Sequence, residues 1–226
     1  MSGFSNLKKG DYREVLFWLL LLGSWQFLVA PGDRNAVFGV IGTAAFLVFA
    51  CWNLGKLTRL GLAYASWRHT TGTVWLVAAA SGLVAGAAIY AIGSASGQNM
   101  ILSHDWRLVV LQLTLGPVLE EVVFRGYLFA LLASSFRKFA PDLVLNWLIV
   151  ITAALIFAIV HLAQPGVSWL QLACITSTGS LYGWIRQRSG STAPAALAHA
   201  VYNLMLYAIV SASGLMRSNP SCCCWI

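Results

Sequence analysis

The sequence predicts an all-α polytopic membrane protein, a bundle of about seven transmembrane helices. Hydrophobic residues make up 59% of the 226 residues and charged residues only 9%, and the mean hydropathy is +0.75. Soluble domains carry about one-quarter charged residues. Because a spanning helix takes about 20 residues plus a connection, this length accommodates about seven spans and leaves no room for a separate soluble domain. We therefore expect the protein to work in or at the lipid bilayer.

Seven apolar runs are long enough to cross a bilayer, and short connections rich in glycine, proline or polar residues separate them. We expect the first run, 15–30, to remain as a span, because it lacks an A-x-A cleavage site and another apolar run follows directly. The run that opens at Val167 is the most polar, but its small hydroxyl residues suit close helix packing in membranes. The runs begin near Val15, Ala36, Thr73, Leu108, Leu143, Val167 and Thr192.

Lysine and arginine gather on alternate connections of this layout. By the positive-inside rule, the N-terminus is cytoplasmic and, with seven spans, the C-terminus lies on the other side. The basic residues form no clustered patch, so we expect no nucleic-acid partner. One side receives Lys8, Lys9, Arg13, Lys56, Arg59, Arg68, Arg137, Lys138, Arg186 and Arg188, and the other receives Arg34, Arg107 and Arg217.

Three consecutive cysteines, Cys222, Cys223 and Cys224, lie directly before the last two residues of the sequence. Trp225 and Ile226 fit the C-a-a-X prenylation pattern poorly, and the predicted topology places this tail on the side opposite to the cytosolic prenyl transferases. We therefore do not expect the tail to be prenylated, and the sequence assigns it no role.

Three ionisable residues, Glu120, Glu121 and Arg125, lie inside the fourth apolar run, 108–135. A charge in the middle of a membrane helix costs about 2.5–3.5 kcal/mol on insertion scales, so such residues are candidates for a functional site. Glu121 and Arg125 are spaced i, i+4 and can pair. Glu120 is rotated by about 100° from Glu121, which leaves its carboxylate free to act as a general base.

Gly116 and Pro117 precede this trio by one turn, and we expect them to loosen the helix and admit water or substrate. A buried ion-pair network that only fixes helix packing is the alternative interpretation. It accounts for Glu121 and Arg125 but leaves Glu120 as a costly surplus.

Two later runs carry polar stripes. Phe157 and His161 share a face near the end of the fifth run, in "FAIVH", and His199 and Asn203 share a face of the seventh, in "HAVYN". Hydrogen bonds between helices are the alternative role for these side chains, because histidine and asparagine also join membrane helices.

Together these side chains suit a hydrolase. A carboxylate and an imidazole can hold and deprotonate water, and amide or imidazole donors can stabilise an oxyanion. Glutamate and histidine are also zinc ligands, but no H-E-x-x-H motif occurs. We expect no cofactor, and zinc held by Glu120 and His161 is the alternative.

The three segments "EEVVFRG", "FAIVH" and "HAVYN" resemble, in order, the three signatures of the CPBP family. This family of intramembrane endopeptidases includes type II CAAX prenyl proteases and bacterial abortive-infection proteins, and its members are described as glutamic endopeptidases or as metalloproteases. The resemblance implies peptide-bond hydrolysis in the membrane, with Glu120 and His161 activating water. His199 and Asn203 would orient groups and stabilise the oxyanion, and Arg125 would hold Glu121.

This resemblance implies three parts: N-terminal transmembrane helices at 1–107, a catalytic core at 108–213 and a tail at 214–226. The expected partners are the lipid bilayer and a membrane-anchored protein or peptide substrate, such as a C-terminal sorting tail or a peptide leader. The compact chain and its strong charge asymmetry indicate a prokaryotic inner (plasma) membrane. Two alternatives stay open: a non-catalytic scaffold or immunity protein, and a proton-coupled transporter, which the absence of an inverted repeat disfavours.

Counting about 1.5 Å per residue from the ends of the runs places Glu120 near the middle of the membrane. The same count places His161 toward the outer side and His199 toward the inner side. A working site needs these groups to converge, so we expect tilted and staggered helices or boundaries shifted by a turn.

Overall fold

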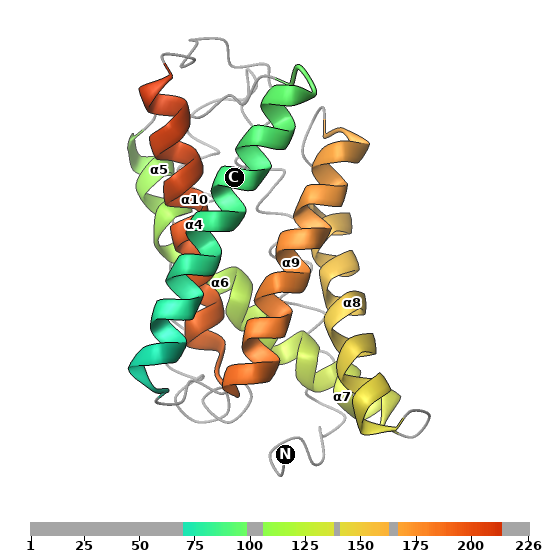
Figure 1. The fold of residues 1–226 in the computed structure, drawn as a ribbon. Helices are drawn as coiled ribbons and strands as arrows, with labels where there is room; N and C mark the ends of the chain where they lie inside the picture. Colours follow the sequence, from blue (N-terminus) through green and yellow to red (C-terminus); the bar gives the residue numbers. More distant parts are fainter. Residues whose placement is uncertain (1–69, 99–105, 138–140, 163–166, 214–226) are drawn as a thin grey trace.

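The computed structural model describes residues 70–98, 106–137, 141–162 and 167–213, and every regular element within these ranges is helical (Figure 1). The elements are α4 (Gly72–Ala95), α5 (Trp106–Leu113), α6 (Leu115–Glu121), the π-helix η2 (Val122–Leu128), α7 (Phe129–Phe136), α8 (Asp142–His161), α9 (Trp169–Ser189) and α10 (Thr192–Ala212). The predicted all-α class is therefore confirmed.

Three of these helices are long and apolar enough to cross a membrane: Gly72–Ala95, Val144–His161 and Thr192–Ala212. The predicted count of seven spans is not confirmed, because the runs at Val15 and Ala36 lie outside the described residues, as does the tail at 214–226. Helices α4, α8, α9 and α10 begin within two residues of the predicted run starts. Helix α9 is less apolar because its middle is rich in serine and threonine.

The fourth apolar run is not the single straight span that was expected. It is divided into α5, α6, η2 and α7, and the first break falls at Thr114, which has φ −125° and ψ −81°. Pro117 explains this position: its ring would clash with the carbonyl of residue i−4, Leu113, so α5 ends there. Pro117 then sits in the first turn of α6, where a helix needs no donor from it. The break therefore occurs two residues before Gly116 and three before Pro117.

The broken run crosses the bundle. In Figure 1, α5 lies beside α10, whereas α6 and α7 pass behind the lower part of α9 toward the start of α8. The segment that carries Glu120, Glu121 and Arg125 is thereby brought between α8, α9 and α10.

Helices α4 and α10 pack closely through glycine. A Cβ at Gly82 would lie 2.4 Å from the Ala198 carbonyl oxygen, and a Cβ at Gly86 would lie 2.8 Å from the Cβ of Met205. Small residues four apart let membrane helices approach in this way. Since Ala198 precedes His199, this contact also fixes the position of His199 in the bundle.

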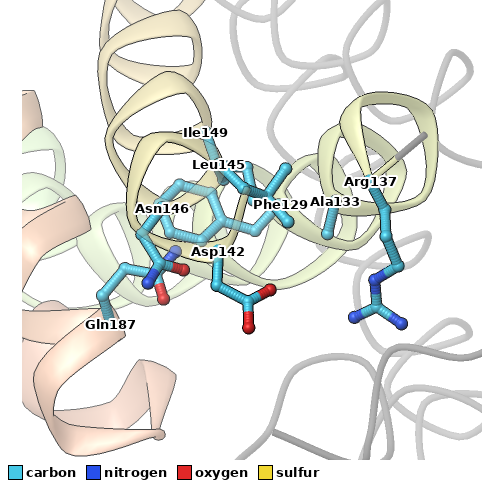
Figure 2. A pocket seen from close by; sticks show the side chains of 8 residues that line it. All are labelled: Phe129, Ala133, Arg137, Asp142, Leu145, Asn146, Ile149 and Gln187. Carbon is cyan, nitrogen blue, oxygen red and sulfur yellow. The ribbon is translucent and has the colours of Figure 1, made fainter. Parts of the chain in front are cut away.

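A cavity of about 300 Å³ lies where α7, the start of α8 and the end of α9 meet (Figure 2). Its lining combines buried apolar side chains with polar ones, and no predicted site residue takes part. The lining residues are Phe129, Ala133, Arg137, Asp142, Leu145, Asn146, Ile149 and Gln187.

Substituting Gly82 with leucine is expected to destabilise the protein by about 1–3 kcal/mol, because the added side chain overpacks the contact with α10. The matched control is Gly72→Leu, since a Cβ at Gly72 meets nothing within 4 Å. Thermal unfolding in detergent measures both. Equal melting temperatures for the two variants would contradict the close packing of α4 on α10.

Candidate active site

Glu121 and Arg125 form a fully buried ion pair. The Arg125 Nη1 atom lies 3.1 Å from Glu121 Oε1, and both side chains are 0% exposed. This is the i, i+4 contact that the spacing predicts. Each charge is removed from both water and lipid, so each depends on its partner.

Arg125 is held by three further groups. Its Nη2 atom donates a hydrogen bond of 2.7 Å to the Gly179 carbonyl oxygen of α9. Its guanidinium carbon lies 4.7 Å from the centre of the Phe157 ring and 5.5 Å from that of Tyr182. Aromatic faces attract a desolvated cation, so these contacts stabilise the arginine inside the bundle.

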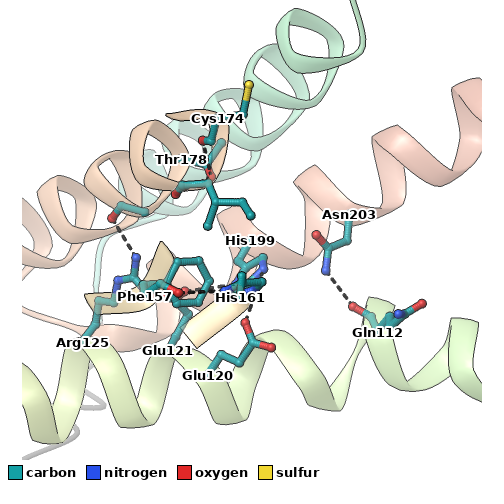
Figure 3. A network of polar contacts seen from close by, with 12 residues as sticks. Gln112, Glu120, Glu121, Arg125, Phe157, His161, Cys174, Thr178, His199 and Asn203 are labelled. Carbon is teal, nitrogen blue, oxygen red and sulfur yellow. Dashed lines mark hydrogen bonds and ion pairs between the residues drawn. The ribbon is translucent and has the colours of Figure 1, made fainter. Parts of the chain in front are cut away.

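His199 of α10 lies between the two glutamates (Figure 3). Its Nδ1 atom is 3.0 Å from Glu121 Oε1, and its Nε2 atom is 3.9 Å from Glu120 Oε2. The Tyr182 ring stacks on the imidazole, with centroids 4.8 Å apart and an interplanar angle of 18°. The imidazole of His199 therefore faces both carboxylates, that of Glu121 with Nδ1 and that of Glu120 with Nε2.

Glu120 differs from Glu121 in its surroundings. Its side chain is 19% exposed, and no lysine or arginine in the described ranges pairs with it. Glu120 is thus the less enclosed of the two carboxylates, whereas the charge of Glu121 is already balanced by Arg125.

His161 joins this group from the end of α8. Its Nδ1 atom lies 2.7 Å from the Phe157 carbonyl oxygen; because a carbonyl only accepts, Nδ1 carries the proton and Nε2 of the neutral ring is left as an acceptor. The Phe157 ring contacts both imidazoles, with its centroid 4.6 Å from that of His161 and 6.0 Å from that of His199. The staggered helices thus bring together histidines that the residue count had placed toward opposite sides.

Asn203 lies one turn beyond His199 on the same face of α10, but it contacts a different element. Its Nδ2 atom donates 2.8 Å to the Gln112 carbonyl oxygen of α5. Its Oδ1 atom is buried and has no hydrogen-bond partner among the described residues. The structure therefore groups Glu120, Glu121, Arg125, His161 and His199, and it ties Asn203 to the adjoining α5.

The sequence did not reveal the π-helix or the part that α9 plays. The π-helix η2 begins directly after Glu121 and contains Arg125, and such segments often occur at functional sites. Arg186 was expected on a connection, yet it lies in α9, is 3% exposed and donates through Nε to the Arg125 carbonyl oxygen at 3.2 Å. The spacing of Gly179, Tyr182 and Arg186 on one helix face was the available signal.

A catalytic zinc site held by Glu120 and His161 stays an alternative prediction. Such sites use three protein ligands, and no group of three His, Cys, Asp or Glu residues in these ranges is placed to hold one metal ion. Glu120 and His161, the pair considered for zinc, would supply two.

Residues 102–205 match the family model described as "Type II CAAX prenyl endopeptidase Rce1-like". No curated protein and no solved structure matches the chain. The matched segment contains Glu120, Glu121, Arg125, His161, His199 and Asn203. The family resemblance drawn from the three motifs is thereby confirmed.

Residues 102–205 are thus similar to the family of type II CAAX prenyl endopeptidases. Together with the apolar helices, the match makes this chain an integral membrane protein of the protease class. The domain boundaries, the prokaryotic membrane and the cytoplasmic N-terminus stay predictions.

Replacing Arg125 with alanine is expected to destabilise the protein by about 3–5 kcal/mol, because Glu121 would be left as an unpaired buried charge. The amount of protein in the membrane and its melting temperature measure the effect, with Arg188→Ala as the control. A double variant, Glu121→Gln with Arg125→Met, should recover part of the loss because it leaves no charge behind. If Arg125→Ala melted like Arg188→Ala, the ion pair would not have the role described here.

Proposed function

We propose that this protein is an intramembrane endopeptidase that hydrolyses a peptide bond in a membrane-associated protein or peptide. The observation that best supports this proposal is that two adjacent carboxylates, those of Glu120 and Glu121, have different surroundings. Glu121 is fully buried and paired with Arg125, whereas Glu120 is partly exposed and lies beside an imidazole. The family match supports the same class of reaction.

Glu120 and His161 would hold the attacking water. A general base must accept a proton near its working pH and be within reach of the water. Glu120 accepts the proton as the water oxygen attacks the carbonyl carbon, and His161 Nε2 accepts the second hydrogen bond from the same water. The transferred proton then passes from Glu120 to the leaving amine as the C–N bond breaks, so the carboxylate is regenerated.

His199 and Asn203 would stabilise the negative charge that develops on the carbonyl oxygen. Preorganised donors in a site that excludes bulk water are effective in this role. The Asn203 amide nitrogen carries two hydrogens, and the bond to Gln112 uses one of them. In this role His199 would be the imidazolium, because its Nδ1–H donates to the Glu121 carboxylate and its Nε2 must also carry a hydrogen to donate to the oxyanion. Nε2 lies on the side of Glu120, where the substrate would meet the attacking water.

The fully buried pair of Glu121 and Arg125 would then affect catalysis indirectly, through the structure of the site. Because Arg125 balances Glu121, the site carries one reactive carboxylate rather than two. Substrates that suit a site enclosed by membrane helices are anchored polypeptides, and a C-terminal sorting tail and a peptide leader are two candidate forms.

Substituting Glu120 with glutamine is expected to abolish cleavage, with a rate loss on the order of 10²-fold or more, while the protein still inserts normally. His161→Ala is expected to have a comparable effect. The measurement compares the membrane proteomes of cells that carry the wild type or the Glu120→Gln variant at equal level and searches for a polypeptide whose terminus changes. An unchanged set of termini would instead favour a non-catalytic scaffold or immunity protein.

A further inference from the structure

Helix α9 presents one buried face to the candidate site. Gly179, Tyr182 and Arg186 are spaced i, i+3 and i+7, so they lie on the same side of the helix. Tyr182 is 1% exposed and Arg186 is 3% exposed. We call these three residues the bracing face of α9, and none of the three lies in the sequence motifs EEVVFRG, FAIVH and HAVYN.

The bracing face contacts Arg125 at two separate points. The Gly179 carbonyl oxygen accepts from the guanidinium at 2.7 Å, and Arg186 Nε donates to the Arg125 backbone carbonyl at 3.2 Å. The first contact fixes the end of the side chain, and the second fixes the peptide. Arg125 is therefore constrained along its whole length by one neighbouring helix.

The backbone contact matters because Arg125 lies inside η2, Val122–Leu128. A side chain that inserts a donor into the carbonyl ladder of a helix accompanies departures from the regular α pattern. Glu120 lies in α6, Leu115–Glu121, directly before η2. Each helical residue turns by about 100°, so a change of one residue in η2 would rotate α6 against the part of the helix that follows and turn Glu120 away from the imidazoles. The Arg186 contact thus holds the register on which the direction of the carboxylates depends.

Tyr182 constrains the other half of the site. Its ring lies nearly parallel to that of His199, at 18°, and this stack sets the plane in which the two ring nitrogens face Glu121 and Glu120. The Tyr182 hydroxyl is buried without a hydrogen-bond partner among the described residues. The ring, rather than the hydroxyl, therefore makes the contact with the site.

We propose that Arg186 and Tyr182 are positioning residues of the active site: Arg186 holds the π-helical register that directs Glu120, and Tyr182 holds the plane of His199. This inference rests on the proposed endopeptidase activity. Neither residue touches the reacting atoms, and both act through residues that do.

Arg186→Gln tests the first half, with Arg188→Gln as the matched control. Arg188 lies two residues further along α9, 5.7 Å from the Trp184 ring and off the bracing face, so both variants remove one positive charge from the same helix end. At equal protein level, Arg186→Gln should slow formation of the Glu120-dependent terminus roughly tenfold to hundredfold, whereas Arg188→Gln should leave it unchanged. Arg186→Lys keeps a donor and should restore part of the rate.

Hydrogen–deuterium exchange supplies a readout that needs no substrate. Amides of residues 122–128 should exchange faster in Arg186→Gln than in Arg188→Gln, while exchange in α4 stays the same. If the two variants cleave and exchange alike, the positioning role of Arg186 is overturned although the proposed activity stands. If instead the Glu120→Gln protein cleaves normally, the proposed activity fails, and the exchange comparison still decides whether Arg186 holds η2.

Tyr182→Phe and Tyr182→Leu test the second half. Phenylalanine keeps the stacked ring and should cleave at the wild-type rate, whereas leucine should lower kcat with little change in KM because it releases the plane of His199. Equal loss in both variants would overturn the proposal in favour of a role for the hydroxyl, and no loss in either would show that His199 needs no such support.

Discussion

The buried ion pair between Glu121 and Arg125 is the constraint around which the described part of the bundle is organised. A membrane interior offers no water to either charge, so removing one partner leaves a large unbalanced cost. The guanidinium also donates from Nη2 to the Gly179 carbonyl and lies over the ring of Phe157. A single arginine thereby determines how α8 and α9 must approach the segment that carries the glutamates.

The ion pair with Arg125 also gives the adjacent residues Glu120 and Glu121 different surroundings. Glu121 is enclosed and balanced, and its Oε1 atom contacts both Arg125 and His199. Glu120 lies on a neighbouring side of the helix, is partly exposed and faces the other nitrogen of His199. Adjacent glutamates can therefore divide the work, since one fixes the imidazole and the other remains available to water. The π-helix and the bracing face of α9 keep this division in register.

Much of this arrangement can be predicted from the sequence, because charged residues inside an apolar run are easily recognised. The i, i+4 spacing of Glu121 and Arg125 predicts their pairing, and the apolar runs predict the starts of α4, α8, α9 and α10. The break before α6 follows from Pro117, which the sequence marks as a loosening of the helix. The π-helix was not predicted, since it depends on tertiary donors such as Arg186 rather than on local propensity. The convergence of His161 with His199 depends on the stagger of whole helices, which residue counting does not supply.

The division of labour between the two glutamates is the central claim, and thermal unfolding of Glu120→Gln and Glu121→Gln in the same detergent tests it most directly. Neutralising Glu121 leaves Arg125 as an unpaired buried charge, so this variant should melt well below the wild type. Neutralising Glu120 removes a carboxylate that has no cationic lysine or arginine partner in the described ranges, so that variant should melt at or above the wild-type temperature. Equal melting temperatures for the two variants would contradict the account.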